Sequence, residues 1–197
     1  HADLATINAG PGTQVRLHKG NGLVRDAFDA KAMALLQGRV GIGHCRYPTA
    51  GSEGSDEAQP FYVNSPFGIA LAHNGNLINT DTLRREVFEQ DRRNVNTESD
   101  SEVLLNVFAH ELDMQRVLTP DAAFRAVEGV IRRAKGCYAV VAVVLGLGLV
   151  AFRDPRLVAG LLAHADWLQR TRVPGLLGAL ARANQPIASG ATEIHFL

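Results

Sequence analysis

The stretch FGIALAHNGNL, residues 67–77, decides the fold class. Its first six residues are apolar or glycine, and the run is bounded by Asn64-Ser65-Pro66 on one side and Asn74-Gly75-Asn76 on the other. A short apolar run between two clusters of turn-forming residues is typical of a buried β-strand. The sequence therefore predicts a strand over residues 67–72 and a tight turn over residues 74–76.

Regular elements are predicted on both sides of this strand from the spacing of apolar residues. The other predicted strands are residues 14–18, 40–44, 137–145 and 147–152. The predicted helices are residues 26–36, 82–90, 99–112 and 120–133. A capping-box pattern, Ser99-Asp100-Ser101-Glu102, marks the start of the third helix, and Pro120 suits the first turn of the fourth. The order of strands, then helices, then strands favours a layered α+β architecture.

Composition restricts the functional classes. The chain has 197 residues, 46% of them hydrophobic, which suits one sizeable core. Twenty basic and 20 acidic residues cancel, and no apolar run approaches the roughly 20 residues of a spanning helix, so neither a nucleic-acid nor a membrane partner is expected. Two cysteines, Cys45 and Cys137, make neither a disulfide framework nor a four-cysteine metal site, which favours a cytoplasmic location.

The composition changes after Pro155. Residues 156–197 are rich in Leu, Ala, Arg and Gly, with helices predicted over residues 157–168 and 176–183 and no recognisable site motif. We therefore expect a domain over residues 1–155 and a divergent tail of unknown role over residues 156–197.

Three polar segments at strand ends or helix starts are candidates for a binding site. Arg46, followed by Tyr47, Pro48 and Thr49, could clamp a carboxylate with its guanidinium or simply pair with a nearby acid. The Asn74-Gly75 step is either a plain turn or a pair of donors, one amide and one backbone N–H, that stabilise an oxyanion.

Asp100 completes the candidate set. Acids in a first helical turn usually complement the helix dipole, but Asp100 could instead pair with a substrate ammonium group. Together, Arg46 and Asp100 could hold the α-carboxylate and α-ammonium groups of an amino acid. Asn74 and Gly75 would then lie where its side-chain carbonyl gathers negative charge.

Four long motifs carry a resemblance to a known family. They are GHCRYPTAGS (residues 43–52), AQPFYVNSPFG (58–68), LAHNGNL (71–77) and SDSE (99–102). These motifs resemble the class II glutamine amidotransferase domain of the amidophosphoribosyltransferase family, and the similarity runs from about Leu4 to Pro155. Glucosamine-phosphate synthase, asparagine synthetase and glutamate synthase share that fold but are poorer matches.

The resemblance implies an N-terminal-nucleophile hydrolase fold, an αββα sandwich of two antiparallel sheets between helical layers. It implies that an N-terminal cysteine attacks the carboxamide of L-glutamine, with its own amino group as base. Asn74 and Gly75 would form the oxyanion hole, Arg46 and Asp100 would grip the amino acid, and Tyr47 and Thr49 would line the pocket. Ammonia would pass to a phosphoribosyltransferase domain, which uses Mg²⁺ and makes phosphoribosylamine for purine synthesis in an oligomeric enzyme.

The chain departs from the family pattern at both ends. Relatives begin with Cys-Gly-Ile, whereas this sequence begins at His1, so we expect the first strand and helix to be missing and the chain to be inactive. Cys45 is not expected to substitute, because its backbone nitrogen is an amide and cannot act as a base. His44 and His73 lack metal-ligand spacing and are interpreted as structural polar contacts; no metal or cofactor is expected in this chain. After Pro155 the family pattern stops, which suggests an altered gene product.

Two alternatives stay open. The domain could be a catalytically dead amino-acid-binding or regulatory module, or a class II amidotransferase with a different acceptor. A start codon directly before His1 would favour the first, and a downstream synthase domain would favour the second. No loop for binding phosphoribosyl pyrophosphate is visible, so this chain is not expected to carry out the transferase reaction alone.

Overall fold

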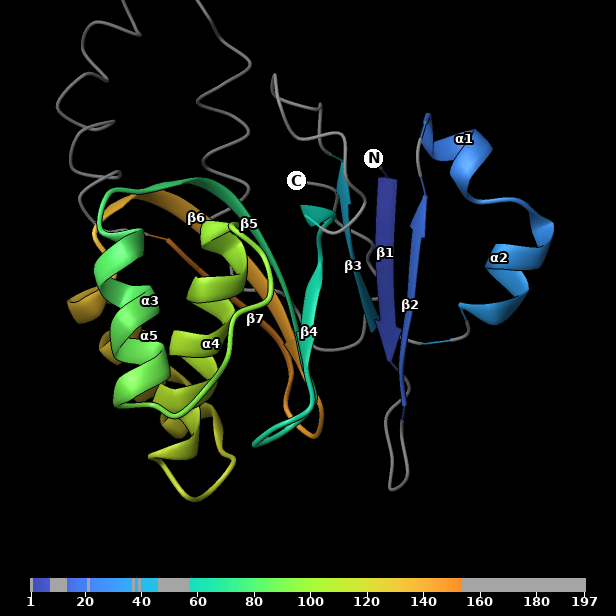
Figure 1. Ribbon diagram of the computed structural model, residues 1–197. Coiled ribbons are helices and arrows are strands. Elements are labelled where there is room, and N and C mark those ends of the chain that lie inside the picture. The colour runs from blue at the N-terminus through green and yellow to red at the C-terminus, as the bar shows by residue number, and fades with distance from the viewer. Residues whose placement is uncertain are drawn as a thin grey trace, which may run out of the picture.

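Two antiparallel β-sheets form the centre of the molecule (Figure 1). The computed structural model describes residues 2–7, 14–20, 22–36, 38, 40–45 and 57–153. The first sheet has the strand order β2-β1-β3, with β1 at Ala2–Ile7, β2 at Val15–Gly20 and β3 at Val40–Cys45. The second has the order β4-β5-β6-β7, with bounds Phe61–Val63, Ile69–Leu77, Gly136–Val144 and Gly148–Arg153.

Helices cover the outer side of each sheet (Figure 1). The short helices α1 (Val24–Ala27) and α2 (Ala30–Leu35) lie beside the first sheet. The longer helices α3 (Thr80–Glu89), α4 (Asp100–Asp113) and α5 (Pro120–Arg133) cover the second. Because β3 contacts both β5 and β6, the sheets face each other and the layers follow the order helix, sheet, sheet, helix. The predicted α+β sandwich is confirmed.

The core has two parts of different character. The larger part lies between the second sheet and helices α3–α5, and its largest members include Phe108, Leu104 and Leu112, all fully buried. Burying a side chain of this size stabilises the fold by about 1.5–3 kcal/mol. The smaller part comprises Ile42, Ala70, Ala72, Val141 and Val143. Its mostly short side chains suit a close approach of the two sheets.

The predicted turn at residues 74–76 is wrong, because β5 runs on through these residues to Leu77. Strand β6 pairs with β5 along its whole length, from Ile69 opposite Val144 to Leu77 opposite Gly136. Gly75 has φ of +124°, a conformation that side chains rarely adopt, which lets the strand continue through this step. The sequence signal for a turn was the Asn-Gly step, and the partner strand some 60 positions later overrides it.

The predicted helix over residues 26–36 is divided into α1 and α2 in the structure. Asp29 accepts a hydrogen bond at its carboxylate from the backbone N–H of Ala32 (2.7 Å), so it caps a new helix in the middle of the predicted one. Strand β4 was not predicted, because it has only three residues. The helix predicted over residues 120–133 has the bounds found for α5.

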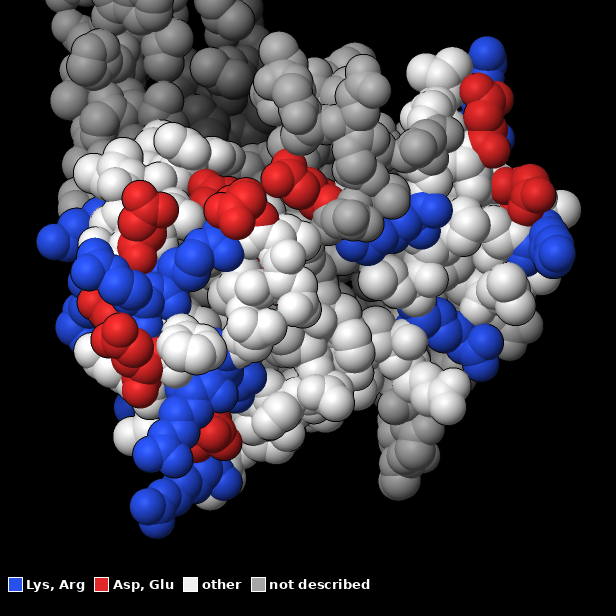
Figure 2. Space-filling model, in the orientation of Figure 1, with Lys and Arg blue, Asp and Glu red and all other residues white. Residues whose placement is uncertain are grey.

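The surface over the outer helices is rich in charged residues. Lys and Arg are interspersed with Asp and Glu over the layer formed by α3–α5 (Figure 2). Among the described residues, no helix has both the length and the apolar character needed to span a membrane. The helices predicted over residues 157–168 and 176–183, and the proposed tail as a whole, lie outside the described residues.

Candidate functional site

A cavity of about 290 Å³ lies where the second half of β5 meets the start of α4. We refer to it as the β5–α4 cavity. It is lined by His44, Gln59, His73, Asn74, Gly75, Asn76, Ser99, Asp100 and Ser101. All nine side chains or backbone units are polar or glycine, so the cavity suits a small polar ligand rather than an apolar one.

Asn74 and Gly75 reach the cavity because of their place on β5. Asn74 is exposed there, although the five residues before it on the strand are all buried. A Cβ atom added at Gly75 would overlap the carbonyl oxygen of Cys137 and lie 2.7 Å from Cα of Tyr138. Position 75 therefore requires glycine both for its backbone conformation and for the close approach of β6.

Asp100 is held at the edge of the cavity by the start of α4. Ser99 caps this helix by accepting a hydrogen bond from the backbone N–H of Ser101 (3.3 Å), and the helix begins where the capping-box pattern predicts. The carboxylate of Asp100 accepts from the backbone N–H of Leu77 through Oδ2 (3.0 Å), which ties α4 to the end of β5. About a fifth of the Asp100 side chain remains exposed, so the carboxylate can also meet a ligand.

Glu102 fixes the segment that leads into α4. Its Oε1 accepts from the backbone N–H of Asn96 (3.0 Å), and its Oε2 accepts from both the N–H and the hydroxyl of Thr97 (2.7 Å each). The usual capping box returns this bond to the cap residue itself. Here Glu102 instead binds Thr97 and Asn96, two and three residues before the cap, so it orders the approach to the cavity as well as the helix start.

His73 lies beneath Asp100 and is almost fully buried. Its Nδ1 forms a hydrogen bond with Oγ of Ser101 (3.0 Å) and lies 3.6 Å from Oδ1 of Asp100. Burial lowers the pKa of His73 below its usual value, against the raising effect of the Asp100 carboxylate, so the ring is neutral at pH 7. The 3.6 Å contact between Nδ1 of His73 and Oδ1 of Asp100 is therefore not an ion pair, and the hydrogen bond to Ser101 orients the ring.

Two further polar side chains complete the walls. Oε1 of Gln59, which is buried, accepts a hydrogen bond from the backbone N–H of His73 (2.6 Å). His44, on β3 of the other sheet, places its Nε2 3.0 Å from Oδ1 of Asn74. The interpretation of His44 and His73 as polar contacts is thus confirmed, but their contacts are to the candidate site itself. Within the described ranges, no cluster of His, Cys, Asp and Glu could hold a metal ion.

The structure brings together three of the six residues predicted for the site, Asn74, Gly75 and Asp100. Arg46, Tyr47 and Thr49 lie outside the described residues. Gln59 and Ser101 were not predicted from the sequence to line the cavity. Neither position could be inferred from nearby sequence, because the fold alone brings these side chains to the cavity. Cys45 is the exposed last residue of β3 and is paired with Ala2 of β1.

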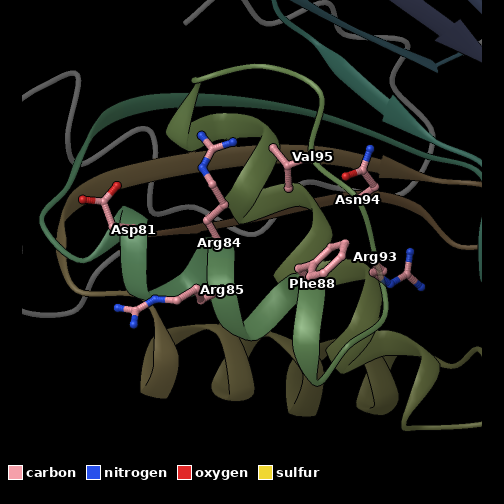
Figure 3. Close-up of a pocket in the computed structure, with 7 residues that line it drawn as sticks. All are labelled: Asp81, Arg84, Arg85, Phe88, Arg93, Asn94 and Val95. Atoms are coloured by element: carbon pink, nitrogen blue, oxygen red, sulfur yellow. The ribbon is translucent and has the colours of Figure 1, made fainter.

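A second cavity of about 360 Å³ lies on the outer side of α3 and contains none of the predicted site residues (Figure 3). Two of its arginines are engaged elsewhere: Arg84 donates to the carbonyl of Thr97 (2.7 Å) and Arg93 to that of Ser65 (3.0 Å). The guanidinium groups of Arg84, Arg85 and Arg93 point in different directions (Figure 3). They do not converge on one anion, so the β5–α4 cavity is the better candidate.

Comparisons with known proteins show which family the chain resembles. A family model described as a glutamine amidotransferase domain matches residues 24–117. The chain is 56% identical over 156 residues to amidophosphoribosyltransferase of Escherichia coli, a match covering 78% of this chain and 30% of that protein. It is 53% identical over 147 residues to amidophosphoribosyltransferase of Saccharomyces cerevisiae, covering 73% of this chain and 29% of that protein.

Solved structures give the same result. A glutamine phosphoribosylpyrophosphate amidotransferase from Bacillus subtilis, complexed with ADP and GMP, superposes with a TM-score of 0.60 at 26% identity, covering 79% of this chain and 31% of the other. A structure described as the allosteric regulatory enzyme of purine biosynthesis superposes with a TM-score of 0.58 at 30% identity, covering 73% and 29%. The chain thus spans under a third of the length of these proteins.

Proposed function

The chain carries a glutamine amidotransferase domain of the amidophosphoribosyltransferase family, and we propose that this domain binds L-glutamine and positions its carboxamide for hydrolysis to glutamate and ammonia. The observation that carries the proposal is the convergence of Asn74, Gly75 and Asp100 on one polar cavity. These residues come from the middle of a strand and the start of a helix, 25 positions apart, and the fold brings them together.

Each residue predicted from the sequence has a chemical task in the proposed site. The Asp100 carboxylate pairs with the α-ammonium group of glutamine, and Arg46, flanked by Tyr47 and Thr49, binds the α-carboxylate. This grip directs the carboxamide toward Asn74 and Gly75. Their amide and backbone N–H groups donate to the oxygen that becomes negative when the carbonyl is attacked, and one such donor typically contributes about 2.7–4 kcal/mol to lowering the barrier.

The wider reaction is also part of the proposal. Ammonia released here would serve a phosphoribosyltransferase domain that forms phosphoribosylamine for purine synthesis, in an oligomeric, cytoplasmic enzyme. The support is the family match to whole amidophosphoribosyltransferases. Mg²⁺ would serve that transferase domain.

Glutamine binding by the 197-residue chain tests the proposal directly. We expect Asp100→Asn to weaken L-glutamine binding about 10- to 100-fold, because a hydrogen bond to a charged group contributes about 1.5–3 kcal/mol. Asparagine retains an oxygen that can accept from the N–H of Leu77, so the helix start is preserved. Isothermal titration calorimetry measures the affinity.

The matched control is Asp121→Asn. Asp121 also lies in the first turn of a helix, α5, and is exposed, so this variant removes the same charge from a first helical turn away from the cavity. It should bind glutamine as the unchanged chain does. Equal affinities for all three proteins would show that Asp100 does not meet the ligand and would refute the proposed site.

A polypeptide that begins at His1 is expected to release no glutamate from glutamine above the rate in buffer. The attacking thiolate in this chemistry needs a free α-amino group as its base, and the backbone nitrogen of Cys45 is an amide within β3. A coupled glutamate dehydrogenase assay measures the release. Glutamate formation that persists in the Cys45→Ser variant would reveal a nucleophile elsewhere and contradict this expectation.

A further inference from the structure

We propose that His44 is a positioning residue that fixes which end of the Asn74 carboxamide faces the ligand, an inference that rests on the proposed function. His44 lies on β3 and Asn74 on β5, so the contact crosses from one sheet to the other. Nε2 of His44 lies 3.0 Å from Oδ1 of Asn74, within ordinary hydrogen-bond range. His44 is assigned no contact with the reacting atoms; it acts through Asn74.

A carboxamide has two chemically opposite ends. Its nitrogen donates two hydrogen bonds and its oxygen only accepts. An oxyanion hole requires the nitrogen to face the ligand, because an oxygen there would repel the developing negative charge. A rotation of the side-chain amide by half a turn would therefore convert a stabilising group into a repulsive one. The strand alone does not prevent this rotation, because Asn74 is exposed on β5.

The contact with His44 prevents the rotation when Nε2 carries a proton. The Nε2–H group then donates to Oδ1 and holds the oxygen on the His44 side. The amide nitrogen is left for the ligand, and no residue in the described ranges accepts a hydrogen bond from it. With the proton on Nδ1 alone, Nε2 would be an acceptor facing an acceptor, and the carboxamide would turn round.

The surroundings of His44 favour a fixed ring. Only 3% of His44 is exposed, whereas Asn74 opens to the cavity. A hydrogen bond from a buried donor to an exposed acceptor keeps its geometry better than a bond between two exposed groups, because water competes less for the buried donor. The arrangement thus prepares the oxyanion hole before the ligand arrives, which is the property that makes such a hole effective.

The ring proton of His44 provides a test that needs no ligand. Long-range ¹H–¹⁵N correlation spectra of the labelled 197-residue chain at pH 7.5 distinguish a proton on Nε2 from one on Nδ1. We expect a proton on Nε2 of His44. A ring protonated on Nδ1 alone would overturn the proposal, whatever the chain binds.

Ligand selectivity provides the second test. L-Glutamate presents a negative γ-carboxylate to the hole, whereas L-glutamine presents a neutral carboxamide that can also donate. In His44→Leu, a free Asn74 amide can turn its oxygen toward the ligand. We expect glutamate affinity to fall about tenfold or more relative to glutamine affinity, the effect of losing one hydrogen bond to a charged group.

His44→Gln is the conservative variant, because its side-chain amide can donate from a similar distance. It should restore the ratio of glutamate to glutamine affinity to within about threefold of the unchanged chain. An equal loss for both ligands in His44→Leu, or no rescue by His44→Gln, would show a merely structural role and refute the inference. If the unchanged chain binds neither amino acid, the proposed function fails, and the ring proton still decides the His44–Asn74 contact.

Discussion

Replacement of Arg133 by methionine is expected to lower the free energy of unfolding by about 3–5 kcal/mol, the cost of removing one partner from a buried ion pair. Arg133 ends α5 and its guanidinium lies among three carboxylates. It contacts Asp91 at 2.8 Å, Glu111 at 3.2 Å and Glu86 at 3.4 Å. One side chain thus joins α3, the segment after it, α4 and α5.

The large effect comes from Asp91 rather than from Arg133 alone. The Asp91 side chain is 3% exposed and the Arg133 side chain 18% exposed. Burial by itself would lower the pKa of Arg133, but the hydrogen bonds and charges of Asp91 and Glu111 outweigh it and the pKa is raised. Without Arg133, Asp91 retains His110, 3.5 Å away, and the attraction of the Arg93 charge, and a poorly compensated buried carboxylate is costly.

Urea unfolding followed by circular dichroism measures this effect, with Arg132→Met as the control. Arg132 is the preceding residue, but its side chain is 70% exposed and its pair with Glu128 is 4.0 Å long. Exposed pairs of this kind contribute about 0–1 kcal/mol, so Arg132→Met should change stability little. Similar losses in the two variants would mean that Asp91 finds other compensation and that the network does not stabilise the helical layer.

Sequence predicted the helices of this layer well, because their signals are local. Ser99 and Pro120 mark starts that the structure places at Asp100 and Pro120. The network around Arg133 has no such signal. Its members are up to 47 positions apart, and nothing in the sequence near Arg133 indicates that Asp91 is buried beside it.

The candidate site was predictable to a similar extent. Asn74, Gly75 and Asp100 were identified from residue type and motif, and the structure places them around one cavity. The roles of His44 and Gln59 were not predictable, because their partners lie 30 and 14 positions away and meet them only after the sheets pack. Resemblance to a family suggested the chemistry, whereas the contacts among the side chains that line the cavity are visible only in the fold.

The Asn-Gly step was selected from the sequence as a site motif and lies at the cavity in the structure, but its local structure was predicted wrongly. Glycine at position 75 serves the pairing of β5 with β6, and the same pairing presents Asn74 to the cavity. Stability and function therefore depend on one backbone conformation. A substitution at Gly75 should reduce both.

Gly75→Ala is expected to lower the free energy of unfolding by about 2–4 kcal/mol, from backbone strain and steric overlap together. Its φ of +124° disfavours any side chain, and the added methyl would overlap the carbonyl of Cys137 and crowd Cα of Tyr138. For a chain of this size the melting temperature should fall by roughly 5–15 °C. Differential scanning calorimetry measures this shift, and glutamine titration should show a parallel loss of binding.

Gly22→Ala separates the two causes. Gly22 also has a positive φ, +106°, but a Cβ atom there would meet nothing within 4 Å. This variant carries the strain without the overlap, so its melting temperature should fall by clearly less than that of Gly75→Ala. Because β6 cannot remain in place against a methyl at position 75, the difference between the variants reports the close approach of the two strands. Equal shifts would mean that β6 moves aside at little cost, and Asn74 would then lack the fixed position that an oxyanion hole needs.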